Sequence, residues 1–429
     1  MSLTRRTLML ITLIVLLANV GLWTSDATLR QLWLFPAALL LLGLAVEGWR
    51  QRRIAIEVAM IGGARARLGR PLDLVLKWRA SRAATLRFMA AGPAGIQVES
   101  RIHTLRIEPD GAECRIAGLP VNLGRARWPE LRGRVRGLFG LAWWTRGLRV
   151  SGEVSIEPDA LGMARRAGTY AAGGASRRAL AGSGSEMHDL REYRRGDPLR
   201  SIDWKASARL GRWIARDRFA EQHLEIVVVL DTGRTSGIAI SGLTRLGHYV
   251  NAACRFAEHA AQNEDRVGLV TFADRPLAAL APAHGLAAIM RLRTTLAAAI
   301  SVPRESNPLP AAARVLAMCR QRALVVLMLD LDDVGSHGQL GQAVRLLRPK
   351  HLPVVCGLLS PELFDLRDGA ARRWLDPFVS LAAAEQIAKL RAGAAALRQL
   401  GAPVVLTAPA QFEETVFATY DRMRARRRV

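Results

Sequence analysis

The sequence predicts an α/β protein whose largest part is a parallel-sheet domain, preceded by a β-sandwich-like domain and an N-terminal two-helix transmembrane hairpin. Three patterns lead to this fold class. Two uncharged apolar runs open the chain, short alternating segments follow, and apolar strand-like runs then alternate with helical periods. We place the hairpin at 1–53, the β-sandwich-like domain at 54–159, a linker at 160–187, and the sheet domain with a charged opening segment at 188–429.

The hairpin is predicted from two apolar runs, expected as helices at about 7–25 and 31–49. The run from Thr7 carries no charge until Asp26, and the second extends from Gln31 to Val46. Basic residues flank the pair and are nearly absent between the runs, so the positive-inside rule puts both ends on the cytoplasmic side. These are Arg5, Arg6, Arg50, Arg52 and Arg53. A cleaved twin-arginine signal, suggested by "TRRTLML", is the alternative, but a second apolar run follows at once.

The middle of the chain reads as short strands and then as a linker. Segments such as "IAIEVAMI", "LDLVLKW" and "GLRVSGEVSIEP" alternate and are separated by Gly, Pro or Asp, as in a small β-sandwich. The stretches "GGAS" and "AGSGS" are small and polar, which is typical of a linker. The four cysteines are far apart and lack a C-x-x-C, which argues against a disulfide framework or zinc site. Cys254, Cys319 and Cys356 lie in helix-like or strand-like runs and indicate buried thiols in a reducing compartment.

The C-terminal half alternates apolar strands with helical periods. The runs "EIVVVLD", "RVGLVTFAD", "ALVVLMLDLDD", "LPVVCGLLS" and "APVVLTAP" are separated by segments of helical spacing. Such unbroken apolar strands predict a parallel sheet with helices on both faces. Ligands of these sheets bind at the carboxyl ends of the strands.

Two of these strands end in carboxylates, at Asp231 and at Asp330, Asp332 and Asp333. If the strands are neighbours, like charges face each other and need a cation or another partner. Hard oxygen ligands suit Mg²⁺. An alternative is that these residues cap strand-to-helix turns through side-chain hydrogen bonds to the backbone.

This layout resembles the von Willebrand factor type A domain, a Rossmann-like fold with a metal-ion-dependent adhesion site. By that resemblance Asp231 matches the first Asp of the site's Asp-x-Ser-x-Ser motif and Thr235 its second Ser. Ser306 is the nearest candidate for the later Thr, and Asp330, then Asp332, for the distal Asp. Gly233 replaces the first Ser and removes one oxygen, so the resemblance implies a degenerate site that holds Mg²⁺ weakly.

The charged stretch "LREYRRGDPLRSIDWKASAR", residues 190–209, is called the signature segment below. Together with the surrounding layout it resembles the bacterial family "domain of unknown function 58", whose run is Leu/Phe-Arg-x-Tyr-x-x-Gly-Asp-x-x-Arg-x-Ile-x-Trp-x-x-Ser-Ala-Arg. The matching site residues are Arg191, Tyr193, Gly196, Asp197, Arg200, Trp204, Ser207 and Arg209.

Two interpretations of the signature segment stay open. In an internal clasp, Asp197 caps the turn that starts "PLRSIDW", Arg200 pairs with a carboxylate across the fold, and Trp204 packs on apolar surface. In the other interpretation the segment is a docking face for a partner.

Composition and charge restrict the classes of function that fit this chain. A net charge of +24 and a pI of about 11.4 point to an anionic neighbour, either nucleic acid or membrane lipid. No aromatic interleaving accompanies the charge, so no specific nucleic acid is expected. The eight His residues lack triad or ligand spacing, which argues against an enzyme.

The family resemblance implies a membrane-anchored, non-enzymatic interaction protein of the bacterial inner membrane. Its partner would be a MoxR-type AAA+ ATPase, with which it would act as an adaptor in the assembly or maturation of envelope complexes. The alternatives are a basic protein that binds nucleic acid or anionic lipid, and a metal-dependent hydrolase.

Overall fold

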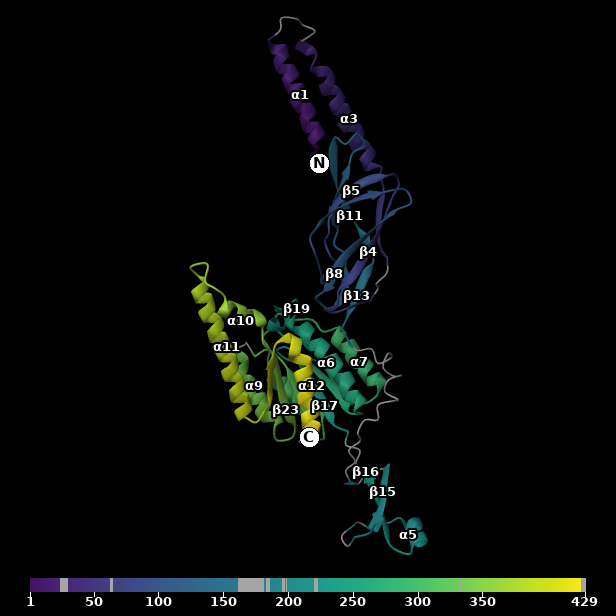
Figure 1. Ribbon diagram of the computed structural model, residues 1–429, viewed down its shortest axis with the longest axis vertical. Coiled ribbons are helices and arrows are strands. Elements are labelled where there is room, and N and C mark those ends of the chain that lie inside the picture. Colours follow the sequence, from purple (N-terminus) through teal and green to yellow (C-terminus); the bar gives the residue numbers. More distant parts are fainter. Residues whose placement is uncertain are drawn as a thin grey trace. The chain divides into compact units, whose positions relative to one another are not determined.

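The computed structural model describes residues 1–23, 30–61, 65–160, 181–182, 186–194, 197, 199–219, 223–331 and 334–425 (Figure 1). The chain divides into two compact units. Unit 1 comprises Met1–Asp159, Gly237–Asn251 and Thr295–Ile300, and unit 2 comprises Ala160–Ser236, Ala252–Thr294 and Ser301–Val429.

Unit 1 opens with two helices, α1 (Arg5–Leu22) and α3 (Leu34–Arg52). Thr4 caps α1, and its hydroxyl accepts the Thr7 N–H at 3.4 Å. In the part of the chain that the structure describes, α1 is the one helix long and apolar enough to cross a bilayer by length and composition. Helix α3 holds Glu47 and two arginines in its last two turns, which lowers its mean hydropathy.

Short strands make up the rest of unit 1 and form two five-stranded sheets and one three-stranded sheet. The strands are β1 (Ser2–Leu3), β2 (Ile56–Ile61), β3 (Arg65–Arg67), β4 (Leu72–Ala80), β5 (Ala84–Met89), β6 (Ile96–Val98), β7 (Ile102–Ile107), β8 (Ala112–Pro120), β9 (Gly124–Arg127), β10 (Leu131–Arg136), β11 (Ala142–Leu148), β12 (Val150–Ser151) and β13 (Glu153–Glu157). The sheet orders are β1-β11-β10-β5-β7, β12-β2-β4-β8-β6 and β3-β13-β9.

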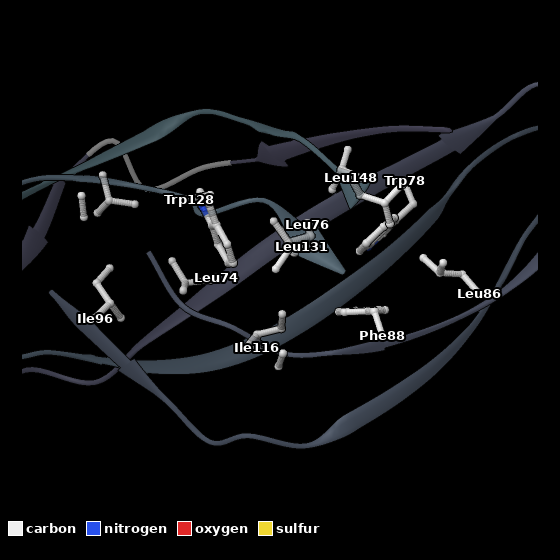
Figure 2. Packing of buried hydrophobic residues seen from close by; sticks show 14 of the residues in the cluster. Leu74, Leu76, Trp78, Leu86, Phe88, Ile96, Ile116, Trp128, Leu131 and Leu148 are labelled. Atoms are coloured by element: carbon white, nitrogen blue, oxygen red, sulfur yellow. The ribbon is translucent and has the colours of Figure 1, made fainter. Parts of the chain in front are cut away.

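The two larger sheets of unit 1 share one hydrophobic core (Figure 2). Along β4 every second residue from Leu74 to Ala80 is buried, as the period of a half-buried strand requires. The ring centroids of Trp78 and Phe88 lie 4.7 Å apart in this core, and Leu131 comes from β10. The strands predicted for 54–159 from alternation are therefore present.

Unit 1 also includes a small hairpin of β18 (Ala239–Ile240) and β19 (Leu243–Thr244) and the first turns of α6 (Arg245–Gln262). Within the unit, the Asn251 side chain donates to the Leu68 carbonyl at 3.3 Å and accepts the Asp159 N–H at 2.9 Å.

Unit 2 is built on a six-stranded sheet of order β21-β20-β17-β22-β23-β24. Its strands are β17 (Glu225–Asp231), β20 (Arg266–Phe272), β21 (Pro276–Ala283), β22 (Ala323–Met328), β23 (Leu352–Leu358) and β24 (Val404–Thr407). Its helices are α6, α7 (Leu286–Ala297), α8 (Pro308–Met318), α9 (Val334–Leu347), α10 (Pro361–Asp368), α11 (Asp376–Gln399) and α12 (Pro409–Ala425). Five strands are parallel, as predicted, whereas β21 pairs antiparallel with β20 and was not foreseen.

Both faces of this sheet are buried, which explains why its strands read as unbroken apolar runs. Val227, Val229 and their counterparts on neighbouring strands pack in one core with residues of α8, α9 and α11. The intervening residues, such as Ile226 and Val228, are fully buried as well.

Three of the four cysteines are buried in unit 2, and burial raises the pKa of the Cys254 and Cys356 thiols to about 12. The prediction of buried thiols therefore holds for these three. Cys114, for which no burial was predicted, is partly exposed in β8.

The signature segment begins in the last strand of a three-stranded sheet of order β14-β16-β15. The elements of this region are β14 (Ala181–Gly182), β15 (Glu186–Glu192), the 3-10 turn η1 (Leu199–Ser201), α5 (Trp204–Leu210) and β16 (Ile214–Phe219).

Candidate functional site

The carboxyl edge of the six-stranded sheet brings two of the predicted site residues together. Strands β17 and β22 are parallel neighbours, and their last registered pair is Leu230 with Met328. Asp231 and Asp330 follow this pair at the same edge, and both are buried. The two acid-ending strands are thus neighbours, which was the condition for facing carboxylates, whereas Asp332 lies outside the described residues.

The Asp231 carboxylate is hydrogen-bonded by a hydroxyl from a loop that is distant in the sequence. Asp231 Oδ1 accepts the Gly233 N–H at 2.8 Å and the Ser306 hydroxyl at 2.6 Å. A Cβ at Gly233 would lie only 2.1 Å from Ser306 Oγ and 3.0 Å from the Arg304 carbonyl. The Ser306 oxygen therefore fills the space that a side chain at 233 would need, so glycine is required there.

The loop after β17 is held by further hydrogen bonds. The Gly233 carbonyl accepts the Ser236 hydroxyl at 2.6 Å and the Ser301 hydroxyl at 3.1 Å. The Val302 N–H donates to the Thr232 carbonyl at 2.8 Å. Thr235 lies in the 3-10 turn η2 (Arg234–Gly237) and is partly buried.

A third acid stands at the same edge and was missed by the sequence analysis. Asp274 follows β20, and its Oδ2 accepts the Arg304 guanidinium at 2.7 Å. This hydrogen bond lowers the pKa of the exposed Asp274 carboxyl. The sequence could have indicated Asp274, because it directly follows the apolar run "RVGLVTFA". Asp231 was predicted on the same ground, as an acid at the end of an apolar strand.

The donor types at this edge are those that hard cations prefer, namely carboxylates and hydroxyls. Asp231, Thr235, Ser306 and Asp330 are the predicted site residues that the structure describes at this edge, and all four are buried or partly buried. Within the described ranges, no group of three or more His, Cys, Asp or Glu is placed to hold a metal ion. Any cation here would therefore depend on hydroxyl oxygens as well as on the two carboxylates.

In the signature segment, the Asp197 side chain binds backwards along the chain. Its Oδ2 accepts the Arg194 N–H at 2.9 Å, and its carbonyl accepts the Tyr193 hydroxyl at 3.0 Å. The predicted cap on the turn that starts at Pro198 involves a residue outside the described ones and stays a prediction, whereas Asp203 caps the next helix, α5. Gly196 lies outside the described residues, as do the side chains of Arg191 and Arg200.

Asp203 and Ser207 fasten α5 to β16. Asp203 Oδ1 accepts the N–H groups of Lys205 and Ala206 at 3.1 Å each, which is an N-cap. The Ser207 hydroxyl accepts the Ile214 N–H at 2.9 Å. The sequence offered the signal for this cap, an Asp directly before a helical stretch, but Asp203 was not singled out.

Large apolar side chains of this region face solvent. Trp204 is 66% exposed and Trp213 is 57% exposed, and the Trp213 ring lies edge-on to Tyr193 with centroids 5.6 Å apart. Leu199 and Leu210 are exposed as well. We call Leu199, Trp204, Leu210 and Trp213 the aromatic surface. Arg209 stands beside it in the last turn of α5 and is exposed.

Comparison with known proteins gives a family for this region. Residues 189–369 match the family model described as "Protein of unknown function DUF58". The conserved hypothetical protein BatB from Bacteroides thetaiotaomicron is 14% identical, with a TM-score of 0.33 over 47% of this chain and 99% of its own. An aerotolerance-related membrane protein from Bacteroides fragilis is 12% identical, with a TM-score of 0.32 over 47% of this chain and 100% of its own. The search of curated proteins found no match.

Proposed function

Because this chain is a member of the DUF58 family over residues 189–369, we propose that it is a membrane-anchored adaptor that binds a protein partner through its signature segment and the residues that follow as far as Trp213, and that it acts without catalysis. The observation that carries this proposal is the aromatic surface. Four large apolar side chains lie exposed inside the family region, one in η1, two in α5 and one just before β16.

Two exposed tryptophans in one short segment favour a docking face over an internal clasp. Soluble surfaces rarely expose several large apolar side chains together, and Trp is enriched among residues that dominate binding energy. The backbone beneath them is held by the Asp203 cap and by the Tyr193 N–H, which donates to the Trp213 carbonyl at 2.8 Å. A surface that is ordered before binding loses less entropy on association.

Charges around the aromatic surface indicate the chemistry of the partner. Lys205 and Arg209 of α5 are exposed, and Arg212, also exposed, lies 3.9 Å from Glu192 Oε1. A complementary partner would offer an apolar pocket for Trp204 inside an acidic rim. We propose a MoxR-type AAA+ ATPase as this partner, in the assembly or maturation of other envelope complexes.

The six-stranded unit would supply a second contact as a von Willebrand factor A-like domain. Its carboxyl edge offers Asp231, Ser306 and Asp330, which would bind Mg²⁺ weakly and leave coordination positions for water or for a partner's carboxylate. Supporting this view, a hydroxyl already lies 2.6 Å from Asp231 Oδ1.

The anchor would be a two-helix hairpin of α1 and α3 in the bacterial inner membrane, with the remaining domains in the cytoplasm. Arg5, Arg6, Arg50, Arg52 and Arg53 flank the pair in the sense of the positive-inside rule. A reporter fused at Val429 is expected to be active only in the cytoplasm, and activity in the periplasm would contradict this topology.

Cross-linking followed by purification from solubilised membranes tests the docking proposal. Trp204→Ala in the full chain is expected to lose the ATPase partner, because truncation removes the central apolar anchor. Trp374→Ala is the matched control, since Trp374 is also highly exposed but lies outside the aromatic surface and outside residues 189–369. Equal recovery of the partner by both variants would contradict the proposal.

Calorimetry of the full chain in detergent with Mg²⁺ and Mn²⁺ tests the strand-end site. Weak binding that disappears in Ser306→Ala is expected. If the heat of cation binding is unchanged in this variant, any cation binds elsewhere in the chain.

A further inference from the structure

Residues 137–140, in the turn between β10 and β11, include two exposed apolar side chains. Leu138 is 56% exposed and Phe139 is 54% exposed, although turns of this length usually hold small or polar residues. The turn is closed by the Gly137 N–H, which donates to the Ala142 carbonyl at 2.9 Å, and by the Gly140 N–H, which donates to the Gly137 carbonyl at 3.0 Å. Two large apolar groups are thus held at the tip of an ordered hairpin.

A buried carboxylate from α3 fixes this turn. Glu47 is 1% exposed, and its Oε1 accepts the N–H groups of Phe139 at 2.7 Å and Leu141 at 3.1 Å. Its Oε2 accepts the Ala142 N–H at 3.2 Å. A Cβ at Gly137 would lie 2.0 Å from Glu47 Oε2, so only glycine leaves room for the carboxylate. Glu47 therefore acts as a clamp between α3 and the turn.

The start of α1 contacts the same turn. The Thr4 hydroxyl donates to the Gly140 carbonyl at 2.7 Å, and the Thr4 N–H donates to the Leu141 carbonyl at 2.9 Å. The Thr7 hydroxyl also donates to the Leu141 carbonyl. The turn is consequently fastened to both helices at the ends where their apolar runs meet the rest of unit 1.

The lengths of the apolar runs place this junction close to lipid. At 1.5 Å per residue, the apolar part of α1 from Leu8 to Leu22 rises about 22 Å, and that of α3 from Leu34 to Val46 about 20 Å. The hydrocarbon core of a bilayer is about 30 Å thick. Helices shorter than the core draw their flanking residues against the membrane surface.

The surroundings of the turn have the composition of a membrane interface. Trp49 is exposed on α3, with the Arg53 guanidinium carbon 3.9 Å from its ring centroid. Aromatic rings and arginines are the residues that anchor proteins at the headgroup level. Anionic headgroups would also meet Arg50 and Arg52 in the last turn of α3.

We infer that residues 137–140 form a lipid-contacting turn that inserts Leu138 and Phe139 into the interfacial layer of the bilayer. This inference rests on the proposed membrane-spanning role of α1 and α3. It assigns to the β-rich part of unit 1 a direct contact with lipid, in addition to the two helices, and it makes Glu47 the residue that positions the contact.

Depth-dependent quenching tests this contact in the full chain. Single cysteines at Phe139, Leu13 and Ile102 are labelled with an environment-sensitive fluorophore, in a Cys114→Ser background because the other three native cysteines are buried. The protein is reconstituted in vesicles of phosphatidylcholine and phosphatidylglycerol with a nitroxide near the headgroup. Ile102 is the control, because it is exposed and its pairing with Met89 lies at the opposite end of β5 from the turn.

Insertion by about 5–10 Å predicts a blue-shifted label at 139 that is quenched several-fold more than the label at 102. A label at 139 that behaves like the one at 102, while the label at 13 in α1 is quenched, overturns the inference and leaves the anchor intact. Absence of quenching at both 13 and 139 overturns the anchor and the inference together. A third outcome would be a label at 139 that is not quenched in the vesicles, although position 139 is protected from labelling in native membranes. This result would overturn contact with lipid and indicate contact with a protein.

Glu47→Gln provides a second measurement on the same labels. The amide offers one acceptor oxygen in place of two, so the turn is expected to loosen and quenching at 139 to fall toward the value at 102, with quenching at 13 unchanged. Unchanged quenching at 139 would contradict the role of Glu47 as the clamp.

Discussion

The two ends of the six-stranded sheet both hold a buried aspartate, but they use it differently. At the carboxyl end, Asp231 accepts a backbone N–H and the hydroxyl of Ser306 from a neighbouring loop. At the amino end, Asp265 precedes β20 and binds groups from two other elements. Its Oδ1 accepts the Leu224 N–H at 3.0 Å, and its Oδ2 accepts the Tyr420 hydroxyl of α12.

The amino-end aspartate has the features of a structural group. Arg424 of α12 lies 3.8 Å from Asp265 Oδ1, and the carboxylate is fully buried. Burial is the largest influence on this group and raises the pKa of Asp265 above its ordinary value of 3.8, against the opposing effect of the Tyr420 hydrogen bond. The contacts with Tyr420 and Arg424 fasten α12 to the sheet, and the Leu224 N–H ties the start of β17 to that of β20. Burial of an acid in a parallel sheet therefore does not by itself mark a site, and the identity of its partners distinguishes the two ends.

The largest expected effect comes from removing the amino-end carboxylate. Asp265→Ala leaves the Leu224 N–H and the Tyr420 hydroxyl without their acceptor, and we expect a loss of about 3 kcal/mol of stability. Hydrogen exchange of β20 and α12 in the detergent-solubilised full chain measures it. If the hydrogen-exchange protection of α12 is unchanged in this variant, Asp265 does not fasten the helix to the sheet, and the proposed difference between the two ends is wrong.

A substitution at the carboxyl end sharpens the comparison. Gly233→Ser forces a Cβ to within 2.1 Å of Ser306 Oγ and is expected to cost about 2 kcal/mol through overpacking. The double variant Gly233→Ser/Ser306→Ala should recover most of this loss, because the new hydroxyl takes the vacated space. A double variant as unstable as the single one would show that Ser306 is not the obstacle.

The pH dependence of stability gives a smaller effect with a defined sign. Because the folded pKa of Asp265 is raised, the folded chain binds this proton more tightly than the unfolded chain. Its contribution to stability is present below pH 3.8 and is lost as the pH rises through the folded pKa. Melting temperatures over this range should fall less steeply in Asp265→Asn than in the unaltered chain, and equal slopes would contradict the raised pKa.

The smallest effect is expected at His351, also at the amino end. Its Nδ1 accepts the Ala323 N–H at 3.1 Å, and burial lowers its pKa below the ordinary 6.5. Here the unfolded chain binds the proton more tightly, so stability is full above pH 6.5 and declines as the pH falls toward the folded pKa. His351→Gln should flatten this decline, as followed by melting temperature between pH 7 and pH 5 at a resolution of about 1 °C. An undiminished decline would assign it to another group.

The sequence was informative where one residue type follows a regular pattern. Unbroken apolar runs located five parallel strands, and the acids at their ends led to Asp231 and Asp330. It was uninformative where a contact joins distant segments. Ser306 lies in a loop 75 residues beyond Asp231, and nothing local shows that its hydroxyl fills the space beside Gly233.

Short-range polar residues were the other difficulty. Asp197 and Asp203 stand six positions apart in the signature segment, and the prediction singled out Asp197, for the turn that starts at Pro198. The structure shows Asp203 capping the helix that begins at Trp204, while Asp197 accepts the N–H of Arg194. The exposure of Trp204 was equally hidden, since a tryptophan among charges suits a clasp and a docking face alike.

The bond between Asp265 and Tyr420 also bears on how the chain emerges from the ribosome. The two residues are separated by 155 positions, and every strand of the sheet is synthesised before α12. Until Tyr420 and Arg424 have been made, β20 enters the nascent sheet beside a carboxylate that lacks its hydroxyl and its cation. During synthesis from the N-terminus, the amino end of the sheet therefore lacks the contacts that α12 makes with Asp265. We expect nascent chains stalled before α12 to be more sensitive to protease than chains stalled after it.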